Sequence, residues 1–359
     1  MQLPVTGHPL HTRSLTTVTH MRADGRLQAR GDVNDLRKCG FVPMVGGIQP
    51  AGIIHQMSID LVLDPASRRI DELVVDQPFV AIEPSEWTAG ECCRDPAVRL
   101  QELVGEPVDG SLTKKLSGVF GGPRGCSHLL TLFQLMASAL PRAMDREEAL
   151  VAELGVPRKP GERLFWRSAF VDGYEAEDGA IEIAVQLHDF HGRPVERPAN
   201  ALDRFARHEE VRVFARVESP SWRISEVHAF ERTREGASLA TAEWTDRSGR
   251  VAPLVGGPVI PGLAGRIFAC LPEGPETAVL RDALLQLAPG QIQIMAAITD
   301  RWFARMRDAG AADATTSDPG PPVGSLGGMA DSCWMWRREG PLGRMRAESI
   351  VTGSDPEPA

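Results

Sequence analysis

The chain of 359 residues contains one pattern twice. Residues 10–35 and 164–189 align without a gap at an offset of 154 positions, and the match returns near residues 67–72. Further along, the phrase Leu-Val-Gly-x-Pro-Val occurs at 103–108 and again at 254–259, an offset of 151. Solenoid repeats have periods of about 20 to 50 residues. This much longer period therefore predicts a duplicated domain. The residues shared by the two copies include Arg13 and Arg167, Asp24-Gly25 and Asp178-Gly179, and Asp35 and Asp189.

Composition and charge exclude several classes of protein. The formal net charge of −9 argues against a nucleic-acid partner and against an anionic membrane surface. No apolar stretch approaches the roughly 20 residues that span a bilayer, and the N-terminus does not resemble a signal peptide. Six scattered cysteines in a chain of this size are typical of reduced thiols. We therefore expect a cytoplasmic protein.

The hydrophobic pattern predicts strands first and helices later in each half. Asp24-Gly25 and Asp178-Gly179 suit tight hairpins, and further alternating segments surround turns at Asp64-Pro65 and Ser219-Pro220. Apolar residues then recur at helical spacing from Leu129, with an expected end at Pro141, and from Leu280, with an expected end at Pro289-Gly290. A further helix is expected over 292–306. The predicted fold class is α+β, a tandem duplication of a strand-rich antiparallel domain with a late packed helix.

This pattern divides the chain into five parts. The first repeat covers 8–147 and the diverged second repeat 162–309, joined by a charged and proline-containing segment at 145–161. Residues 310–328 are poor in large apolar side chains and are expected to be a flexible linker. A segment at 329–350 carries Trp334 and Trp336, which we expect to dock on the body or on a partner subunit, and 351–359 is expected to be a disordered tail.

The strongest chemical candidate is Gly-Cys-Ser-His at 125–128, at the start of the first late helix. A helix N-terminus carries partial positive charge, so Gly125 and Cys126 could hold an anion, and the thiol there is expected to have a lowered pKa. At offset 151, Cys126 aligns with Thr277 and His128 with Val279, so the second copy lacks these polar groups. Two explanations stay open: chemistry kept in one copy, or drift of a helix cap in which Cys126 is only a buried filler.

Other polar residues have weaker patterns. Arg13 alternates with apolar neighbours and is expected to face inward, where Asp35 is its obvious partner, and the pair is either a structural tie or an anion holder. His55 and Tyr174, the only tyrosine, could act as acid or base. No phosphate loop, dinucleotide fingerprint or zinc spacing is present. We expect no cofactor and no metal, although Cys126, His128 and one distant ligand could together form a metal site.

Read together, these motifs resemble a bacterial family, the domain-of-unknown-function family 2889. The shared elements in the first half are Arg13, the turn Arg22-Ala-Asp24-Gly25, Asp35, Met57 in a polar strand, and Gly-Cys-Ser-His-Leu at 125–129. Residues 8–144 resemble the family clearly, and the segment Cys333–Pro341 does so weakly. Ser127 replaces the family's usual threonine, and His20 stands where an aromatic residue is usual.

The resemblance implies an enzyme, because some relatives are associated with breakdown of lignin-derived dimers. The implied activity is a carbon–carbon lyase without cofactor, either a decarboxylase or a formaldehyde lyase, that opens a phenylcoumaran ring to give a stilbene. His128, Tyr174 or His55 would be the base, Arg13, Gly125 and Cys126 would hold the anion, and Trp334 and Trp336 would cover the rings.

Two other functions remain open. One is a hydrolase that uses the thiol of Cys126 or a metal, and the other is a ligand-binding or assembly protein without catalysis. The expected partners are a small aromatic substrate and a second copy of the chain as a homodimer, without nucleic acid or membrane.

Overall fold

The computed structural model describes residues 1–44, 47–236, 239–301 and 328–345. The linker expected at 310–328 lies almost entirely outside the described residues, and the tail expected at 351–359 lies wholly outside them. None of the helices within the described ranges is long and apolar enough to cross a membrane.

One antiparallel sheet of nine strands carries the described fold, in the order β4-β3-β2-β1-β5-β6-β7-β8-β9. The α+β class is therefore confirmed, and the two halves meet where β1 pairs with β5. The hairpins expected at Asp24-Gly25 and Asp178-Gly179 join β1 to β2 and β5 to β6. The strands are β1 His8–Met21, β2 Leu27–Met44, β3 Gly47–Asp64, β4 Arg69–Phe79, β5 Arg163–Glu175, β6 Ile181–Gly192, β7 Phe205–Glu218, β8 Arg223–Glu235 and β9 Thr245–Asp246.

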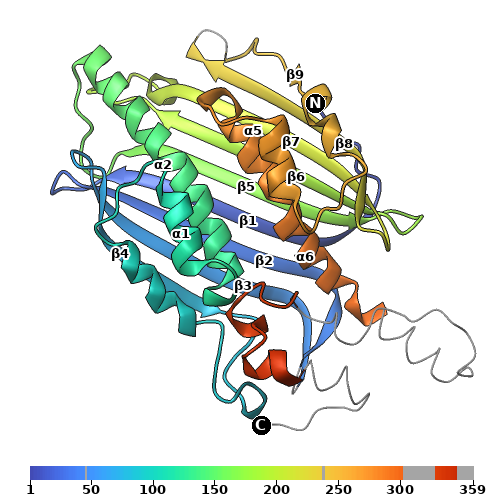
Figure 1. The fold of residues 1–359 in the computed structure, drawn as a ribbon. Coiled ribbons are helices and arrows are strands. Elements are labelled where there is room, and N and C mark those ends of the chain that lie inside the picture. The colour runs from blue at the N-terminus through green and yellow to red at the C-terminus, as the bar shows by residue number, and fades with distance from the viewer. Residues whose placement is uncertain (45–46, 237–238, 302–327, 346–359) are drawn as a thin grey trace, which may run out of the picture.

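The longer helices lie on one face of this sheet (Figure 1). Side chains alternate along a strand, so every second residue faces the helices and is apolar over most of the sheet, as with Leu15 in β1 and Val185 in β6, both fully buried. The other face keeps residues such as Trp166 and Phe170 partly exposed. The helices are α1 Leu112–Phe120, α2 Ser127–Leu154, α3 Ser248–Val251, α4 Leu263–Cys270, α5 Pro275–Leu285 and α6 Leu287–Ala297.

Two expected helix ends are wrong. The helix α2 continues through Pro141 to Leu154, so it also occupies much of the segment expected to join the repeats. Proline removes one backbone hydrogen bond, but α2 packs on the sheet on both sides of Pro141, and that packing outweighs the loss of one bond. Likewise α6 contains Pro289 and Gly290. A Cβ atom at Gly290 would lie 2.6 Å from the side chain of Val171, so this glycine allows α6 to approach β5 closely rather than ending a helix.

Between the strands and helices, each half has an isolated bridge at the same place. Isolated bridges join Arg69 to Pro107 and Arg223 to Pro258, and each precedes a helix, α1 or α4. Short 3-10 helices lie in these connections: η1 Glu86–Thr88, η2 Asp95–Leu103, η3 Gly122–Arg124, η4 Ala201–Arg204 and η6 Ala252–Leu254.

The C-terminal segment packs against the first half. It contains η8 Trp334–Trp336 and lies beside the start of α2 (Figure 1). Met335 is buried in a small apolar cluster with Ile82, Leu342 and Met345. The backbone N–H of Trp334 donates to the carbonyl oxygen of Gly125 at 2.8 Å. This segment therefore supports the loop that leads into α2.

Candidate functional site

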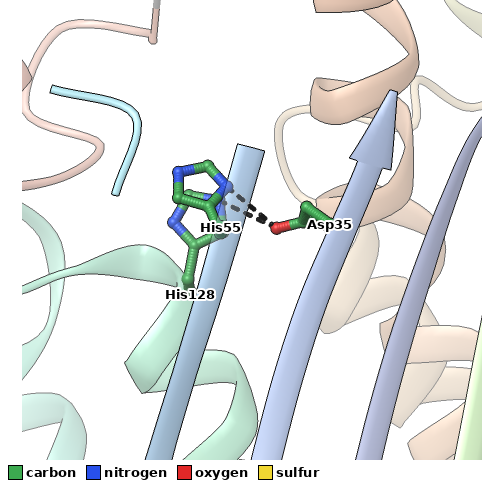
Figure 2. A group of neighbouring side chains, drawn as sticks. All are labelled: Asp35, His55 and His128. Atoms are coloured by element: carbon green, nitrogen blue, oxygen red, sulfur yellow. Dashed lines mark hydrogen bonds and ion pairs between the residues drawn. The ribbon is translucent and has the colours of Figure 1, made fainter. Parts of the chain in front are cut away.

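The strand register places three polar side chains in one row across the sheet. Arg13 of β1 is opposite Asp35 of β2, and Asp35 is opposite His55 of β3. Residues directly opposite in antiparallel strands point to the same side of a sheet. All three therefore face the helices. Figure 2 shows two of them, Asp35 and His55, next to His128 from the start of α2.

Arg13 and Asp35 form a buried ion pair, as the sequence predicted. The Nε of Arg13 donates to Oδ1 of Asp35 at 2.7 Å, and Nη2 donates to Oδ2 at 3.0 Å. Burial of Asp35 opposes ionisation, but the guanidinium of Arg13 and the hydrogen bond from His55 together hold the pKa of this carboxyl well below its usual range. Asp35 is therefore an ionised carboxylate at neutral pH.

Asp35 orients the imidazole of His55. The Nδ1 atom of His55 lies 3.0 Å from Oδ2 of Asp35. An ionised carboxylate only accepts hydrogen bonds, so Nδ1 carries the proton and donates it. In the neutral ring this hydrogen bond leaves the free lone pair on Nε2, and Nε2 makes no hydrogen bond to any residue that the structure describes. This is the arrangement in which a histidine acts as a proton acceptor.

His128 lies against His55 from the first turn of α2. The two ring centroids are 3.6 Å apart with an interplanar angle of 32°. The Nε2 atom of His128 lies 3.6 Å from Oδ2 of Asp35 and 2.9 Å from the side-chain nitrogen of Gln293 in α6. Burial, followed by the nearby His55 and Arg13, holds the pKa of His128 well below its usual value. The second imidazole is therefore neutral.

Gly125 and Cys126 shape the loop before α2. A Cβ atom at Gly125 would lie 2.1 Å from the carbonyl oxygen of Phe120, so only glycine fits. Cys126 is the N-cap residue with extended backbone, which turns its Sγ to within 3.7 Å of Nδ1 of His128. Two residues spaced this way do not meet within a helix, and they meet here because Cys126 precedes it.

The expectation of a reactive thiol at Cys126 is wrong. Burial raises the pKa of Cys126 to about 12, because the loss of hydration outweighs the backbone N–H groups at the start of α2 and the charge of Arg13, which lower it. The thiol is 5% exposed and belongs to the main apolar core. Cys126 is therefore protonated at neutral pH and is not a nucleophile in this state.

Sequence reasoning missed two members of the site. His11 lies two residues before Arg13 on the same face of β1, and its Nε2 is 3.5 Å from Oδ1 of Asp35 without a hydrogen bond. Burial, which outweighs the attraction of Asp35, lowers the pKa of His11 to about 4. Strand alternation could have identified His11. Gln293 gave no local signal, because it reaches His128 only through the packing of α6 on β1 and β2.

The structure places the other predicted site residues elsewhere. Tyr174 lies in β5 opposite Pro9, and no contact joins it to Asp35, His55 or His128 among the described residues. Trp334 and Trp336 pack beside the small apolar cluster around Met335. The ring of Trp334 lies between the guanidinium groups of Arg99 and Arg337, at 5.5 and 3.6 Å. The backbone of Trp334 thus contacts the loop before α2, and within the described residues its ring contacts are to these two arginines and not to the row of polar side chains.

A metal ion is a second way to use this donor set. One ligand atom each from Asp35, His55 and His128 lies within 4.8 Å of the others. Two imidazoles and a carboxylate suit Zn²⁺ or Fe²⁺. Arg13, however, already bonds both oxygens of Asp35. A metal ion would have to share this carboxylate with a neighbouring guanidinium, so proton transfer fits the residues better.

Two described cavities lie away from this row. One, of about 670 Å³, is on the uncovered face and is lined by aromatic residues of β5 and β6 such as Trp166, Phe170 and Phe190. The other, of about 760 Å³, lies beside α2 and α5 and includes Asp189 and Glu209, which align with Asp35 and His55 at the offset of 154. At the row itself, His128 keeps 14% of its side chain exposed, so its edge is the accessible part of the site.

The geometry defines a buried histidine–aspartate centre on the helix-covered face of an antiparallel sheet. The family described as "Protein of unknown function (DUF2889)" matches residues 11–141, which confirms the resemblance seen in the sequence. This region begins at His11 and contains Arg13, Asp35, His55 and His128, but not Gln293. The comparisons with curated proteins and with solved structures gave no match.

Proposed function

We propose that this protein is a cofactor-independent carbon–carbon lyase in which His55 is the proton acceptor. The supporting observation is the hydrogen bond of 3.0 Å from Nδ1 of His55 to the ionised Asp35, which leaves Nε2 of His55 without a partner among the described residues. A carboxylate in this position fixes the tautomer and stabilises the imidazolium that forms after proton transfer. Enzymes that move protons without a cofactor need such a base in a fixed orientation.

The proposed substrate is a phenolic aromatic dimer of the phenylcoumaran type, as the family resemblance implies. His55 removes the phenolic proton, and the phenolate expels the para-benzylic ether oxygen to form a quinone methide. The imidazolium returns its proton to the departing aryl oxide. Loss of the γ group as carbon dioxide, or as formaldehyde after removal of its hydroxyl proton, then supplies the electron pair that restores the aromatic ring and forms the stilbene double bond.

These steps involve no net oxidation or reduction, so the proposed reaction needs neither an oxidant nor an organic cofactor. The neutral His128, stacked on His55, would be the second proton carrier required for the formaldehyde route. We also propose that the fold arose by duplication, and that the protein acts in the cytoplasm as a homodimer on a small aromatic substrate.

The test is incubation of the purified full chain with phenylcoumarans that carry either a γ-carboxyl or a γ-hydroxymethyl group. We expect stilbene absorbance to appear together with carbon dioxide or formaldehyde. His55→Ala should abolish turnover, whereas Glu209→Ala, the aligned position in β7, should retain it. Absence of stilbene from both substrates would overturn the proposed reaction.

A metal-dependent hydrolase is the second candidate, because the ligand atoms of Asp35, His55 and His128 converge. Elemental analysis of the purified chain separates the two candidates. One metal ion per chain, with activity lost on chelation and recovered on adding the ion, would favour the hydrolase. Metal-free protein that is fully active would exclude it. A purely ligand-binding role would be favoured if His55→Ala and His128→Ala changed only the melting temperature.

A further inference from the structure

Each half has a buried arginine that binds an aspartate through the same two nitrogens. The third guanidinium nitrogen has a different environment in each half. Arg13 binds Asp35 through Nε and Nη2. Arg167 binds Asp189 through the same two nitrogens, and both of these bonds are 2.6 Å long. Both pairs are related by the offset of 154. Arg13 and Arg167 are 2% and 1% exposed, so each guanidinium is removed almost fully from water.

The later helices follow the offset of 151, and their contacts agree with it. Gln293 of α6 reaches across to His128 in the first half. Its counterpart at this offset, Arg142 of α2, reaches across to Asp189 in the second half at 3.4 Å. One helix of each half therefore contacts the buried polar residues of the other half, and the two contacting residues are at matching positions.

In the second half, the third nitrogen of the arginine holds a carboxylate. The Nη1 atom of Arg167 donates to Oδ2 of Asp282 at 2.6 Å, and Asp282 is itself buried. Although burial disfavours the charged guanidinium, Asp189 and Asp282 raise the pKa of Arg167 above its usual value. All three guanidinium nitrogens of Arg167 therefore donate to carboxylates of the same chain.

In the first half, none of the residues that the structure describes takes the place of that carboxylate. At the offset of 151, Asp282 corresponds to Thr131, whose hydroxyl group donates to the carbonyl oxygen of Ser127 in its own helix at 2.8 Å. The Nη1 atom of Arg13 makes no hydrogen bond to any residue that the structure describes. Arg13 as a whole is only 2% exposed, but Nη1 is not among the fully buried polar atoms without a partner, so it keeps some accessible surface. An anionic oxygen of a ligand can therefore reach Nη1 and accept a charge-assisted hydrogen bond from it.

We propose that Nη1 of Arg13 binds an anionic oxygen of the ligand, a carboxylate or a phenolate, in the position that Asp282 occupies on Arg167. The ligand's anion would then lie beside the stacked rings of His55 and His128. This inference rests on the proposed function for the identity of the substrate, but anion binding itself requires no turnover.

Three probes test the proposal by calorimetry on the full chain at neutral and mildly alkaline pH. They are 4-methoxybenzoate, 4-nitrophenol and the neutral 4-methoxybenzyl alcohol. We expect one of the two anions to bind at least about tenfold more tightly than the alcohol, because a charged hydrogen bond to a buried arginine is strong. Preference for the benzoate assigns a carboxylate, and preference for the nitrophenolate assigns a phenolate. Equal binding of all three probes by the wild-type chain would overturn the proposal.

Two variants of Thr131 test whether the anion binds at this position. Thr131→Asp supplies the carboxylate that the second half has, and we expect it to reduce anion affinity to that of the alcohol. Thr131→Asn has nearly the same shape without the charge and should retain the preference for the anion. Undiminished anion binding by a folded Thr131→Asp protein would also contradict the proposal. Anion binding without stilbene formation would reject the lyase alone, whereas stilbene formation without anion preference would reject this inference alone.

Discussion

The side-chain nitrogen of Gln293 lies 2.9 Å from Nε2 of His128, although 165 positions separate the two residues in the sequence. The amide donates to the imidazole, which places the proton of His128 on Nδ1, facing the sulfur of Cys126 at 3.7 Å. The second half of the chain thus sets the tautomer of a histidine in the first half.

Gln293→Leu should therefore impair the site more than the fold. We expect turnover to fall about tenfold and the free energy of unfolding to fall by about 1 kcal/mol, because Nε2 of His128 loses its donor. Gln291→Leu is the matched control in the same helix, since neither side-chain polar atom of Gln291 has a partner among the described residues. It should leave turnover unchanged and raise stability. Similar activity losses in both variants would contradict a specific role for Gln293.

Asp35→Asn should separate orientation of His55 from structural support. The amide leaves Arg13 without a charged partner, which costs about 3 kcal/mol in the free energy of unfolding. It also replaces one of the two acceptor oxygens by an NH2 group, so Arg13 and His55 must share the remaining oxygen, and turnover should fall by about 10² to 10⁴. Asp189→Asn removes the same structural tie from Arg167. Denaturant unfolding should show a smaller loss for Asp189→Asn, because Arg167 keeps the carboxylate of Asp282, and activity assays should show a large loss for Asp35→Asn only.

Cys126→Ala should retain activity within about threefold, because burial raises the pKa of this thiol to about 12 and keeps it protonated. Alkylation with iodoacetamide in the folded state at pH 8, followed by peptide mass mapping, should leave Cys126 unmodified. Rapid alkylation, or loss of activity beyond a hundredfold in Cys126→Ala, would instead support thiol chemistry.

His11 should make stability depend on pH. Its pKa is lowered from 6.5 to about 4 in the folded state, so the unfolded chain takes up the proton first as the pH falls. Stability is then fully present above pH 6.5 and is lost between pH 6.5 and about 4, by about 3 kcal/mol from this residue. His11→Phe, which copies the aligned and buried Phe165, should flatten the dependence and raise stability at pH 5.

The control for this pH effect is His8→Gln, because His8 is exposed. Denaturant unfolding of both variants between pH 4 and pH 8 gives the free energy of unfolding as a function of pH for this comparison. An unchanged slope in His11→Phe would show that His11 is not held neutral by burial. Part of the slope should persist in either case, since burial also lowers the pKa values of His128 and His191.

Gly125→Ala should displace the start of α2. The added methyl group would meet the carbonyl oxygen of Phe120 at 2.1 Å, and the strain should cost about 2 kcal/mol and reduce turnover. Gly118→Ala lies in the exposed part of α1 with open space around it and should stabilise the chain by up to about 1 kcal/mol. Thermal unfolding of the two alanine variants should therefore shift in opposite directions.

The sequence predicted those features that depend on local spacing. The Asp-Gly hairpins and the inward-facing pair of Arg13 and Asp35 follow from turn chemistry and strand alternation, and both are confirmed. The continuation of α2 through Pro141 could not be predicted, because packing on both halves outweighs one lost hydrogen bond. The pKa of Cys126 was assigned in the wrong direction, because a helix N-terminus lowers a thiol pKa only where the sulfur is hydrated or near a cation.

The sequence pattern also could not predict that the residues of the site would meet. His55, His128 and Gln293 come from a strand and two helices, and their meeting depends on the register of β2 with β3 and on how α2 and α6 lie on the sheet. Sequence alone gave His55 and His128 as separate candidates. Only the fold shows that both surround the carboxylate of Asp35.

The pairing of β1 with β5 at the centre of the sheet decides how the protein can be divided for study. The family match ends at residue 141, and a fragment cut there would leave β1, a strand of 14 residues, as an unprotected edge. Open edges of this length recruit other strands and cause aggregation. Expression of the matched region by itself should therefore yield insoluble or intermolecularly paired material, and the intact chain is the smallest unit in which His128 can be assayed.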